Sequence, residues 1–277
     1  MKQRILSGIV MAVIVAAVLL LSIPFPVAIT LFLGVISGVA VYEMLYNTKL
    51  VENKTVVAVS VIFTGVMKLA YTFGGFFEKY LNGQRLTEIL TVCFALFLII
   101  YAVARHNSFT AKQMCFSFAM PVLLSFAFNS IEYIYLESGL SFYGLLMLVN
   151  FACINDIGAY FIGSKFGRHK MTPVISPKKT VEGAIGGIAC SLIATVIVVA
   201  LFNGFRFDII MIKWLILTPV FCIVGIYGDL IASVIKRYAG IKDYGNVIPG
   251  HGGIMDRLDS ALLIAPAMEL LLKLLLK

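Results

Sequence analysis

Long apolar runs, separated by short polar segments, recur from one end of the chain to the other. They approach or exceed the roughly 20 residues that a helix needs to cross a ~30 Å hydrocarbon core. They predict spans at about 5–23, 27–46, 55–73, 88–104, 114–129, 143–163, 183–203, 213–235 and 260–276. Pro24 and Pro26 separate the first two spans, because proline removes a backbone donor and resists helix continuation. The pattern predicts an all-α, polytopic membrane helix bundle of about nine transmembrane helices.

The composition agrees with this prediction. Hydrophobic residues make up 61% of the 277 residues and charged residues 13%, and the mean hydropathy is +1.00. Soluble domains are only about half apolar. The first apolar stretch is longer than the ~7–15 residues of a signal-peptide core, so we expect an uncleaved first span. The five cysteines lie in apolar runs without a CxxC pair, which favours a role as small core residues.

Lysine and arginine are distributed unequally between alternate loops. One side holds most of them and includes the polar loops 164–182 and 236–259. The other side holds Lys79, Arg85, Arg206, Lys213 and the tail lysines, together with Glu132 and Glu137. Because positively charged loops stay in the cytoplasm, we expect a cytoplasmic N-terminus and an external C-terminus. Both polar loops of this multi-pass inner (plasma) membrane protein then face the cytoplasm, which contains the nucleotides.

The net charge of +8 fits contact with anionic headgroups or anionic substrates. It does not indicate nucleic acid, since no basic strip is interleaved with exposed aromatic residues. We expect two regions. Residues 1–140 supply membrane anchoring and possible contacts with a second copy in a homodimer. Residues 141–277 form a catalytic region that contains both polar loops.

The eighth span places a carboxylate, Asp229, about two turns inside an apolar helix. An ionised aspartate at that depth costs a few kcal/mol, so it should face a polar cavity and a cation. Ser233 and Lys236 follow at helical spacings of four and three and share its face. A structural ion pair with Lys236 or Arg237 is the alternative from this segment alone.

The loop after this span is rich in glycine and in charged residues. Gly250, Gly252 and Gly253 surround His251 and allow backbone N–H groups to approach an anion. Asp256 and Asp259 follow at a spacing of three, which predicts that a helix beginning there presents both on one face. Two carboxylates of this kind suit Mg²⁺, which takes few protein ligands. Helix capping is the alternative for either aspartate alone, and we expect His251 to shape the loop or bind phosphate.

A third polar segment precedes the seventh span. Asp156 is a second carboxylate inside an apolar run, and Ser176, Lys178, Lys179 and Thr180 follow in loop 164–182. Lysines before a helix can hold a polyphosphate as mobile charges. Anchoring to lipid headgroups is the alternative for the lysines alone.

Two further charged residues lie inside predicted spans. Glu43 is in the second span and Lys68 in the third. For both we expect pairing between helices, or a side chain that extends its charge toward the headgroups.

The polar segments resemble the phosphatidate cytidylyltransferases, also called CDP-diglyceride synthetases. That family's C-terminal signature runs Ser, Lys-Arg, Lys-Asp, Pro-x-His-Gly-Gly, Asp-Arg and Asp. Here these positions are Ser233, Lys236, Arg237, Lys242, Asp243, Pro249, His251, Gly252, Gly253, Asp256, Arg257 and Asp259. The segment around Asp156 and 176–180 is similar too, so the specific resemblance covers about residues 155–260.

The resemblance implies a reaction of CTP with phosphatidic acid that gives CDP-diacylglycerol and pyrophosphate. It also implies Mg²⁺, with room for a second cation such as K⁺. We expect catalytic roles for Asp229, Asp256, Asp259, Lys236 and Arg257, with the three aspartates as metal ligands. The expected substrate-binding residues are Asp156, Ser176, Lys178, Lys179, Thr180, Ser233, Arg237, Lys242, Asp243, Gly250, His251, Gly252 and Gly253.

The alternative function is an ion-coupled membrane transporter that uses Asp156 and Asp229 as an ion pathway. No pair of matching interrupted helices supports it. Flux in proteoliposomes without a need for CTP would distinguish it from the transferase. A CDP-alcohol phosphotransferase would require a DxxDGxxAR motif, and a P-loop enzyme GxxxxGK[ST]; the sequence contains neither.

Overall fold

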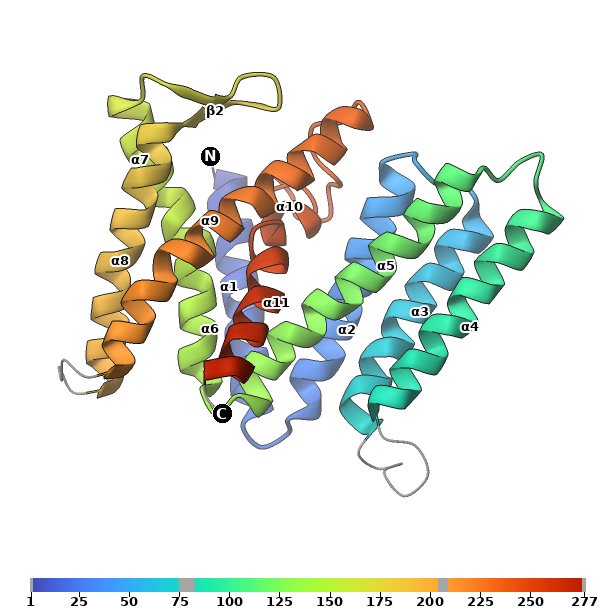
Figure 1. Cartoon of the computed structure of the whole chain (residues 1–277), viewed down its shortest axis with the longest axis horizontal. Helices are drawn as coiled ribbons and strands as arrows, with labels where there is room; N and C mark the ends of the chain where they lie inside the picture. The colour runs from blue at the N-terminus through green and yellow to red at the C-terminus, as the bar shows by residue number, and fades with distance from the viewer. Residues whose placement is uncertain (1, 75–82, 204–208, 276–277) are drawn as a thin grey trace. The chain divides into compact units, whose positions relative to one another are not determined.

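The computed structural model describes residues 2–74, 83–203 and 209–275, and each predicted span overlaps a helix (Figure 1). Within these ranges, seven helical segments are long and apolar enough to cross a membrane: Val27–Asn47, Lys54–Phe73, Arg85–Ala104, Ala111–Glu137, Ser141–Phe166, Val181–Phe202 and Ile209–Tyr238. The predicted all-α, polytopic membrane fold is confirmed. The count of nine and the orientation stay predictions, and Lys79, Arg206 and Lys277, which contributed to them, lie outside the described residues.

The chain forms two compact units. The first comprises Met1–Glu132 and Ala239–Arg257, and the second Tyr133–Tyr238 and Leu258–Lys277. Most of loop 236–259, which the sequence analysis assigns to the C-terminal region, therefore packs with the N-terminal helices.

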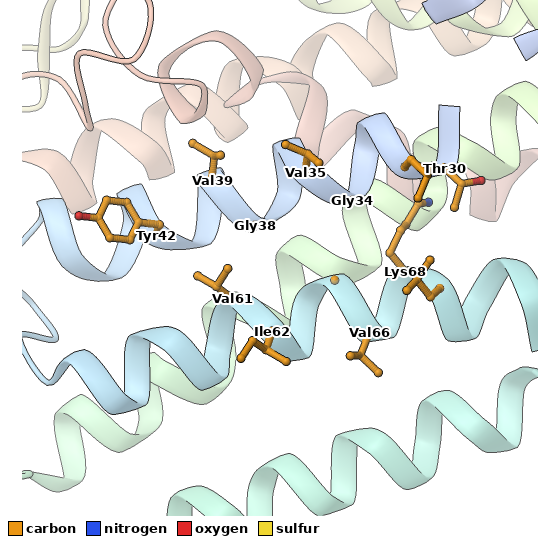
Figure 2. Close-up of a pocket in the computed structure, with 13 residues that line it drawn as sticks. Thr30, Gly34, Val35, Gly38, Val39, Tyr42, Val61, Ile62, Val66 and Lys68 are labelled. Carbon is orange, nitrogen blue, oxygen red and sulfur yellow. The ribbon is translucent and has the colours of Figure 1, made fainter. Parts of the chain in front are cut away.

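The first unit contains the following helices: α1 (Lys2–Ser22), α2 (Val27–Tyr42), the π-helix η1 (Glu43–Asn47), α3 (Lys54–Phe73), α4 (Gly83–Ala104) and α5 (Ala111–Glu132). Helix α3 packs against α2, α4 and α5. Asn53 starts α3, since its side chain accepts hydrogen bonds from the N–H groups of Thr55 and Val56. An apolar groove of about 550 Å³ lies between α2 and α3, with Tyr42 at one end and Lys68 at the other (Figure 2).

A buried ion pair holds the helices of this unit together. Lys68 on α3 pairs with Glu132 on α5, and both side chains are almost fully buried. Thr30 on α2 donates to Glu132 at 2.5 Å, and Thr72 donates at 3.0 Å. The expected interhelical pairing of Lys68 is confirmed. The assignment of Glu132 to an external loop is wrong, because α5 extends to this residue and the carboxylate compensates a buried lysine.

The second unit contains the following elements: η3 (Tyr133–Glu137), α6 (Ser141–Val149), η4 (Asn150–Ile154), α7 (Asn155–Phe166), β1 (Lys170–Thr172), β2 (Ser176–Thr180), α8 (Val181–Asn203), α9 (Ile209–Tyr238) and α11 (Ala261–Leu275). A short helix, α10 (Met255–Leu258), crosses the boundary between the units along the chain. Strands β1 and β2 form an antiparallel hairpin that pairs Lys170 with Thr180. The sequence predicts only a loop, 164–182, where this hairpin lies.

Helices α7 and α8 lie side by side, with the hairpin at their ends (Figure 1). Glycine makes this approach possible: a Cβ at Gly187 would lie 2.5 Å from the backbone oxygen of Asn155, and one at Gly183 would lie 2.7 Å from that of Ala159. The close packing places Asp156 on α7 beside the end of β2.

Candidate active site

The second unit gathers three carboxylates from different elements. Asp156 lies on α7, Asp229 on α9 and Asp259 in the turn between α10 and α11. Lys179 Nζ is 2.6 Å from Asp229 Oδ2, and Ser260 Oγ donates to Asp156 Oδ2 at 3.5 Å. The structure thus brings together Asp156, Lys179, Asp229 and Asp259, which the sequence proposed on separate segments.

The expected helical face of α9 is present. Ser233 Oγ donates to Asp229 Oδ1 at 3.4 Å, one turn along the helix. Lys236, one further turn away, acts on the charge of Asp259. Asp229 also pairs with Lys179, a cation from another segment that the alternative of an ion pair with Lys236 or Arg237 does not include.

The pKa of Asp259 depends on its burial and on the charges around it. Burial, together with the negative charges of Asp229 and, more weakly, Asp156, raises the pKa of Asp259 to about 7. Lys236 and the backbone N–H of Ser260, which donates to Asp259 Oδ1 at 2.8 Å, act in the opposite direction. Burial and the neighbouring carboxylates therefore both disfavour an ionised Asp259, and a cation there would favour its ionised form.

Gly228 positions Asp259 beside α9. A Cβ at Gly228 would lie 2.8 Å from the backbone oxygen of Asp259 and 3.2 Å from Ser260 Cα. The turn before α11 can approach α9 this closely only because residue 228 has no side chain. Asp229, the next residue, and Asp259 consequently belong to the same cluster.

Strand β2 supplies the basic side of the cluster. Lys178, Lys179 and Thr180 line a cavity of about 260 Å³ together with Asp156 and Asp229. Lys178 is exposed, and Ser176 and Lys179 are half-buried. The buried Thr180 accepts the N–H of Gly183 at 3.1 Å, which caps the first turn of α8. The lining of this cavity thus includes both lysines and carboxylates.

The base of the hairpin is tied to α8. Glu182 accepts the backbone N–H of Arg168 at 3.0 Å, and its Oε1 lies 2.5 Å from His169 Nδ1. These contacts tie the chain just before β1 to the first turn of α8, which directly follows β2.

The first unit carries the glycine-rich loop. The N–H of His251 donates to the oxygen of Ile248 at 2.9 Å, which closes a four-residue turn. Pro249 and Gly250 occupy its centre, and Gly250 has φ +77°, as a type II turn requires. Ser7 Oγ lies 2.7 Å from His251 Nδ1, so α1 fixes the imidazole. Loop geometry, one of the two roles expected for His251, is supported by these contacts.

Asp256 and Asp259 belong to different units. Asp256 Oδ2 accepts the N–H groups of Tyr244 at 2.8 Å and Gly253 at 3.0 Å, so it closes the glycine-rich loop. Helix α10 ends at Leu258, and Asp259 lies in the following turn. The prediction that a helix presents both aspartates on one face is therefore wrong, because this helix is a single turn and stops between them.

The remaining expected residues lie at the ends of these elements. Lys242 and Asp243 are exposed and line a polar cavity of about 840 Å³ with Tyr46, Asn47, Lys49 and Glu52 of the first unit. Arg237 and Arg257 are exposed, and Lys236 is half-buried.

Sequence reasoning missed Gly228, Ser260 and the role of Glu43. Gly228 precedes Asp229, and a glycine inside an apolar helix is itself a signal of close approach. Glu43 accepts backbone hydrogen bonds from the glycine-rich loop, so the expectation of interhelical pairing or snorkelling is wrong for this residue.

Known proteins match this chain over nearly its full length. The profile of the cytidylyltransferase family matches residues 2–275. The chain belongs to the cytidylyltransferase family. It is 34% identical to the phosphatidate cytidylyltransferase of Bacillus subtilis, over 99% of this chain and 98% of the relative. It is 32% identical to the one of Staphylococcus saprophyticus, over 98% and 99%, and 33% identical to the one of Staphylococcus haemolyticus, over the same shares.

Family membership confirms the resemblance expected from the signature residues. The chain is thus a multi-pass membrane nucleotidyltransferase. The transporter alternative is not favoured, because the matching relatives are transferases.

The carboxylates fit a divalent cation of the kind this family implies. Within the part of the chain that the structure describes, no three His, Cys, Asp or Glu side chains converge closely enough to enclose a metal ion alone. Mg²⁺ does not need such a cage, because it binds through one or two carboxylates, waters and substrate phosphates. Asp229 and Asp259, which lie close enough to act on each other's charge, supply that donor set.

Proposed function

We propose that this protein transfers CMP from CTP to phosphatidic acid in an Mg²⁺-dependent reaction at the cytoplasmic face of the inner membrane. The lipid phosphate oxygen attacks the α-phosphorus of CTP, the bond to the β-phosphate breaks, and pyrophosphate leaves. The products are CDP-diacylglycerol and pyrophosphate. The observation that carries the proposal is the meeting of Asp156, Asp229, Asp259 and Lys179 in one cluster of a cytidylyltransferase-family membrane protein.

The acidic residues are assigned to the metal. Asp229, Asp256 and Asp259 are the proposed Mg²⁺ ligands, and a second cation such as K⁺ is part of the proposal. Bound Mg²⁺ would neutralise the CTP phosphates and polarise the α-phosphorus. Asp156 accepts a hydrogen bond from Ser260, the neighbour of Asp259, and thereby orients the turn that carries this ligand.

The basic residues are assigned to the anions. Lys178 and Lys179, with Ser176 and Thr180 on the same strand, bind the phosphates that become pyrophosphate. Lys236 and Arg257 neutralise charge that develops during transfer. Arg237, Lys242, Asp243, Ser233 and the loop Gly250–Gly253 complete substrate binding.

Three of these assignments have direct physical support. Lys179 lies against Asp229, so the anion-binding strand and a metal carboxylate share one cavity. The attacking phosphate needs no general base, since phosphate monoesters are mostly dianionic near pH 7. Helix α9 carries Asp229 inside an apolar segment, which lets a lipid phosphate approach from the bilayer.

The direct test uses purified protein with CTP, phosphatidic acid and Mg²⁺, and follows lipid-linked CMP and released pyrophosphate. We expect both products in equal amounts and their loss on chelation of the metal. Asp256→Ala should abolish turnover, and Glu88→Gln, which changes an exposed carboxylate on α4, should not. Normal turnover by Asp256→Ala would contradict the metal assignment.

The orientation in the membrane and the oligomeric state are tested separately. Cysteines placed in loops 164–182 and 236–259 should both react with an impermeant reagent only from the cytoplasmic side. Light scattering in detergent measures whether the helices of 1–140 support a homodimer.

A further inference from the structure

Glu43 is a charged residue in an apolar membrane-spanning segment that no step of the proposed reaction uses. It lies where α2 passes into the π-helix η1, and its side chain is 0% exposed. A buried carboxylate in such a segment costs a few kcal/mol unless strong partners compensate it, so its contacts require an explanation.

The partners of Glu43 come from one loop that is distant in sequence. Its Oε1 accepts the N–H of Ile254 at 3.1 Å, and its Oε2 accepts the N–H of Met255 at 2.9 Å. No salt bridge to Glu43 occurs within residues 2–74, 83–203 and 209–275. The carboxylate is therefore committed to the backbone immediately before Asp256.

The loop is shaped to admit this carboxylate. A Cβ at Gly253 would lie 2.5 Å from Glu43 Oε2, and a Cβ at Gly245 would lie 2.5 Å from Oε1. With the Glu43 side chain in this position, residues 245 and 253 must therefore be glycine, because any Cβ would clash with the carboxylate. One turn later, Asn47 Nδ2 donates to the oxygen of Tyr244 at 2.9 Å.

Asp256, which belongs to the same loop, accepts hydrogen bonds from the backbone of that loop. It accepts the N–H groups of Tyr244 and Gly253, and Tyr244 is 0% exposed. Segment 244–256 is thus closed by Asp256 and fastened to η1 by Glu43 and Asn47. A π-helix often marks a functional site, and here it turns Glu43 and Asn47 toward one loop.

We propose that Glu43 is a positioning residue that clamps the glycine-rich loop of residues 244–256, and so sets the affinity for the nucleotide phosphates and for Mg²⁺. The effect on CTP and Mg²⁺ rests on the proposed function. The contact between Glu43 and the loop can be measured without an activity assay.

Glu43→Gln is the sharpest variant. Glutamine keeps the size of the side chain, but an NH₂ group replaces one of the two carboxylate oxygens. This NH₂ cannot accept a hydrogen bond and faces one of the two N–H donors. We expect the KM for CTP and the Mg²⁺ concentration for half-maximal rate to rise, and kcat/KM for CTP to fall roughly 10–100-fold, as for other groups that orient ligands. The KM for phosphatidic acid should not change.

Hydrogen exchange tests the clamp directly. In Glu43→Gln the amides of Ile254 and Met255 should exchange faster, while the amides of α3 and α5 keep their protection. Unchanged exchange at residues 254 and 255 would overturn the clamp. A general increase through the first unit, with a lower yield and unchanged KM values, would show a merely structural residue and would also overturn the proposal.

Glu132→Gln is the matched control. It also neutralises a buried carboxylate of the first unit, but its partners are Lys68, Thr30 and Thr72 rather than the loop. We expect it to lower thermal stability without changing exchange at residues 254 and 255 or the KM for CTP.

A second variant keeps the proposal testable if Glu43→Gln does not fold. Asn47→Ala removes one neighbouring contact to Tyr244 and should produce the same changes at smaller size. If the wild type shows no turnover with CTP but exchange still depends on Glu43, the proposed function has failed and the clamp stands. If turnover is normal and neither variant alters exchange or the KM for CTP, the clamp has failed alone.

Discussion

Gly228→Ala tests whether the contact between α9 and the turn before α11 sets the spacing of the metal carboxylates. The added Cβ would lie 2.8 Å from the backbone oxygen of Asp259 and 3.2 Å from Leu263 Cβ. A comfortable carbon–oxygen contact is about 3.3 Å or more, so the turn must move by roughly 0.5 Å. The nearest neighbours are backbone atoms of the tight turn and the Cβ of Leu263, and none of these atoms can rotate away.

The energetic consequence is modest and the catalytic one is larger. Overpacking of this kind costs about 1–3 kcal/mol, partly offset by the ~1 kcal/mol by which alanine favours a helix over glycine. Thermal unfolding in one detergent should therefore show a small loss. A misplacement of about 1 Å can cost ~100-fold in rate, so a shift of half that size should lower kcat on the order of 10-fold. The Mg²⁺ requirement should rise, because Asp259 moves relative to Asp229.

Gly65→Ala is the matched control. Gly65 also lies inside an apolar helix, but a Cβ there meets no atom within 4 Å, because it faces the groove between α2 and α3. We expect unchanged kinetics and equal or higher stability. If Gly228→Ala matched the wild type in kcat and in Mg²⁺ dependence, the reasoning that this contact spaces the carboxylates would be refuted.

Three further predictions concern other contacts. Lys179→Met removes the cation that lies 2.6 Å from Asp229, a proposed metal ligand, and should lower kcat about 100- to 1000-fold. Lys178→Met changes an exposed neighbour and should mainly raise the KM for CTP. Equal effects of the two variants on kcat and KM would contradict the assignment. Lys68→Met or Glu132→Gln leaves one buried charge unpaired and should lower the free energy of unfolding by about 3–5 kcal/mol. The double variant should lose less stability than the sum of the two single variants. Additive losses in thermal unfolding would argue against the ion pair. Glu182→Gln loosens the hairpin, so trypsin should cleave it faster with the helices intact, and an unchanged cleavage rate would show that this side chain does not hold it.

Most of the membrane-spanning architecture could be predicted from local pattern. In lipid, every backbone N–H and C=O must be satisfied within the segment, so a long apolar run has few options other than a helix. The predicted segment 213–235 lies within Ile209–Tyr238, and the segment 55–73 within Lys54–Phe73. Polar residues in such runs also stand out because they are costly, and the sequence alone therefore selected Asp156, Asp229, Glu43 and Lys68.

The predictions that were wrong concern residues whose structure depends on a short break in a helix or on a partner that is distant in sequence. Asp256 and Asp259 have the spacing of a shared helical face, but α10 ends after one turn and the two residues join different units. Glu132 follows the predicted end of a span and was assigned to a loop, yet the buried Lys68 makes a longer helix favourable. No local pattern records either partner.

By itself, the sequence determined the membrane helices, the family and the residues that carry charge into the bilayer, because each depends on local hydrophobicity or on a short motif. Only the tertiary structure decided which of these charges meet. Lys179 reaches Asp229, and Glu43 reaches the loop before Asp256, across separations of 50 and 211 residues. Such contacts depend on how closely helices pack, and glycines such as Gly228 and Gly187 set that distance through backbone atoms that no hydrophobic pattern describes.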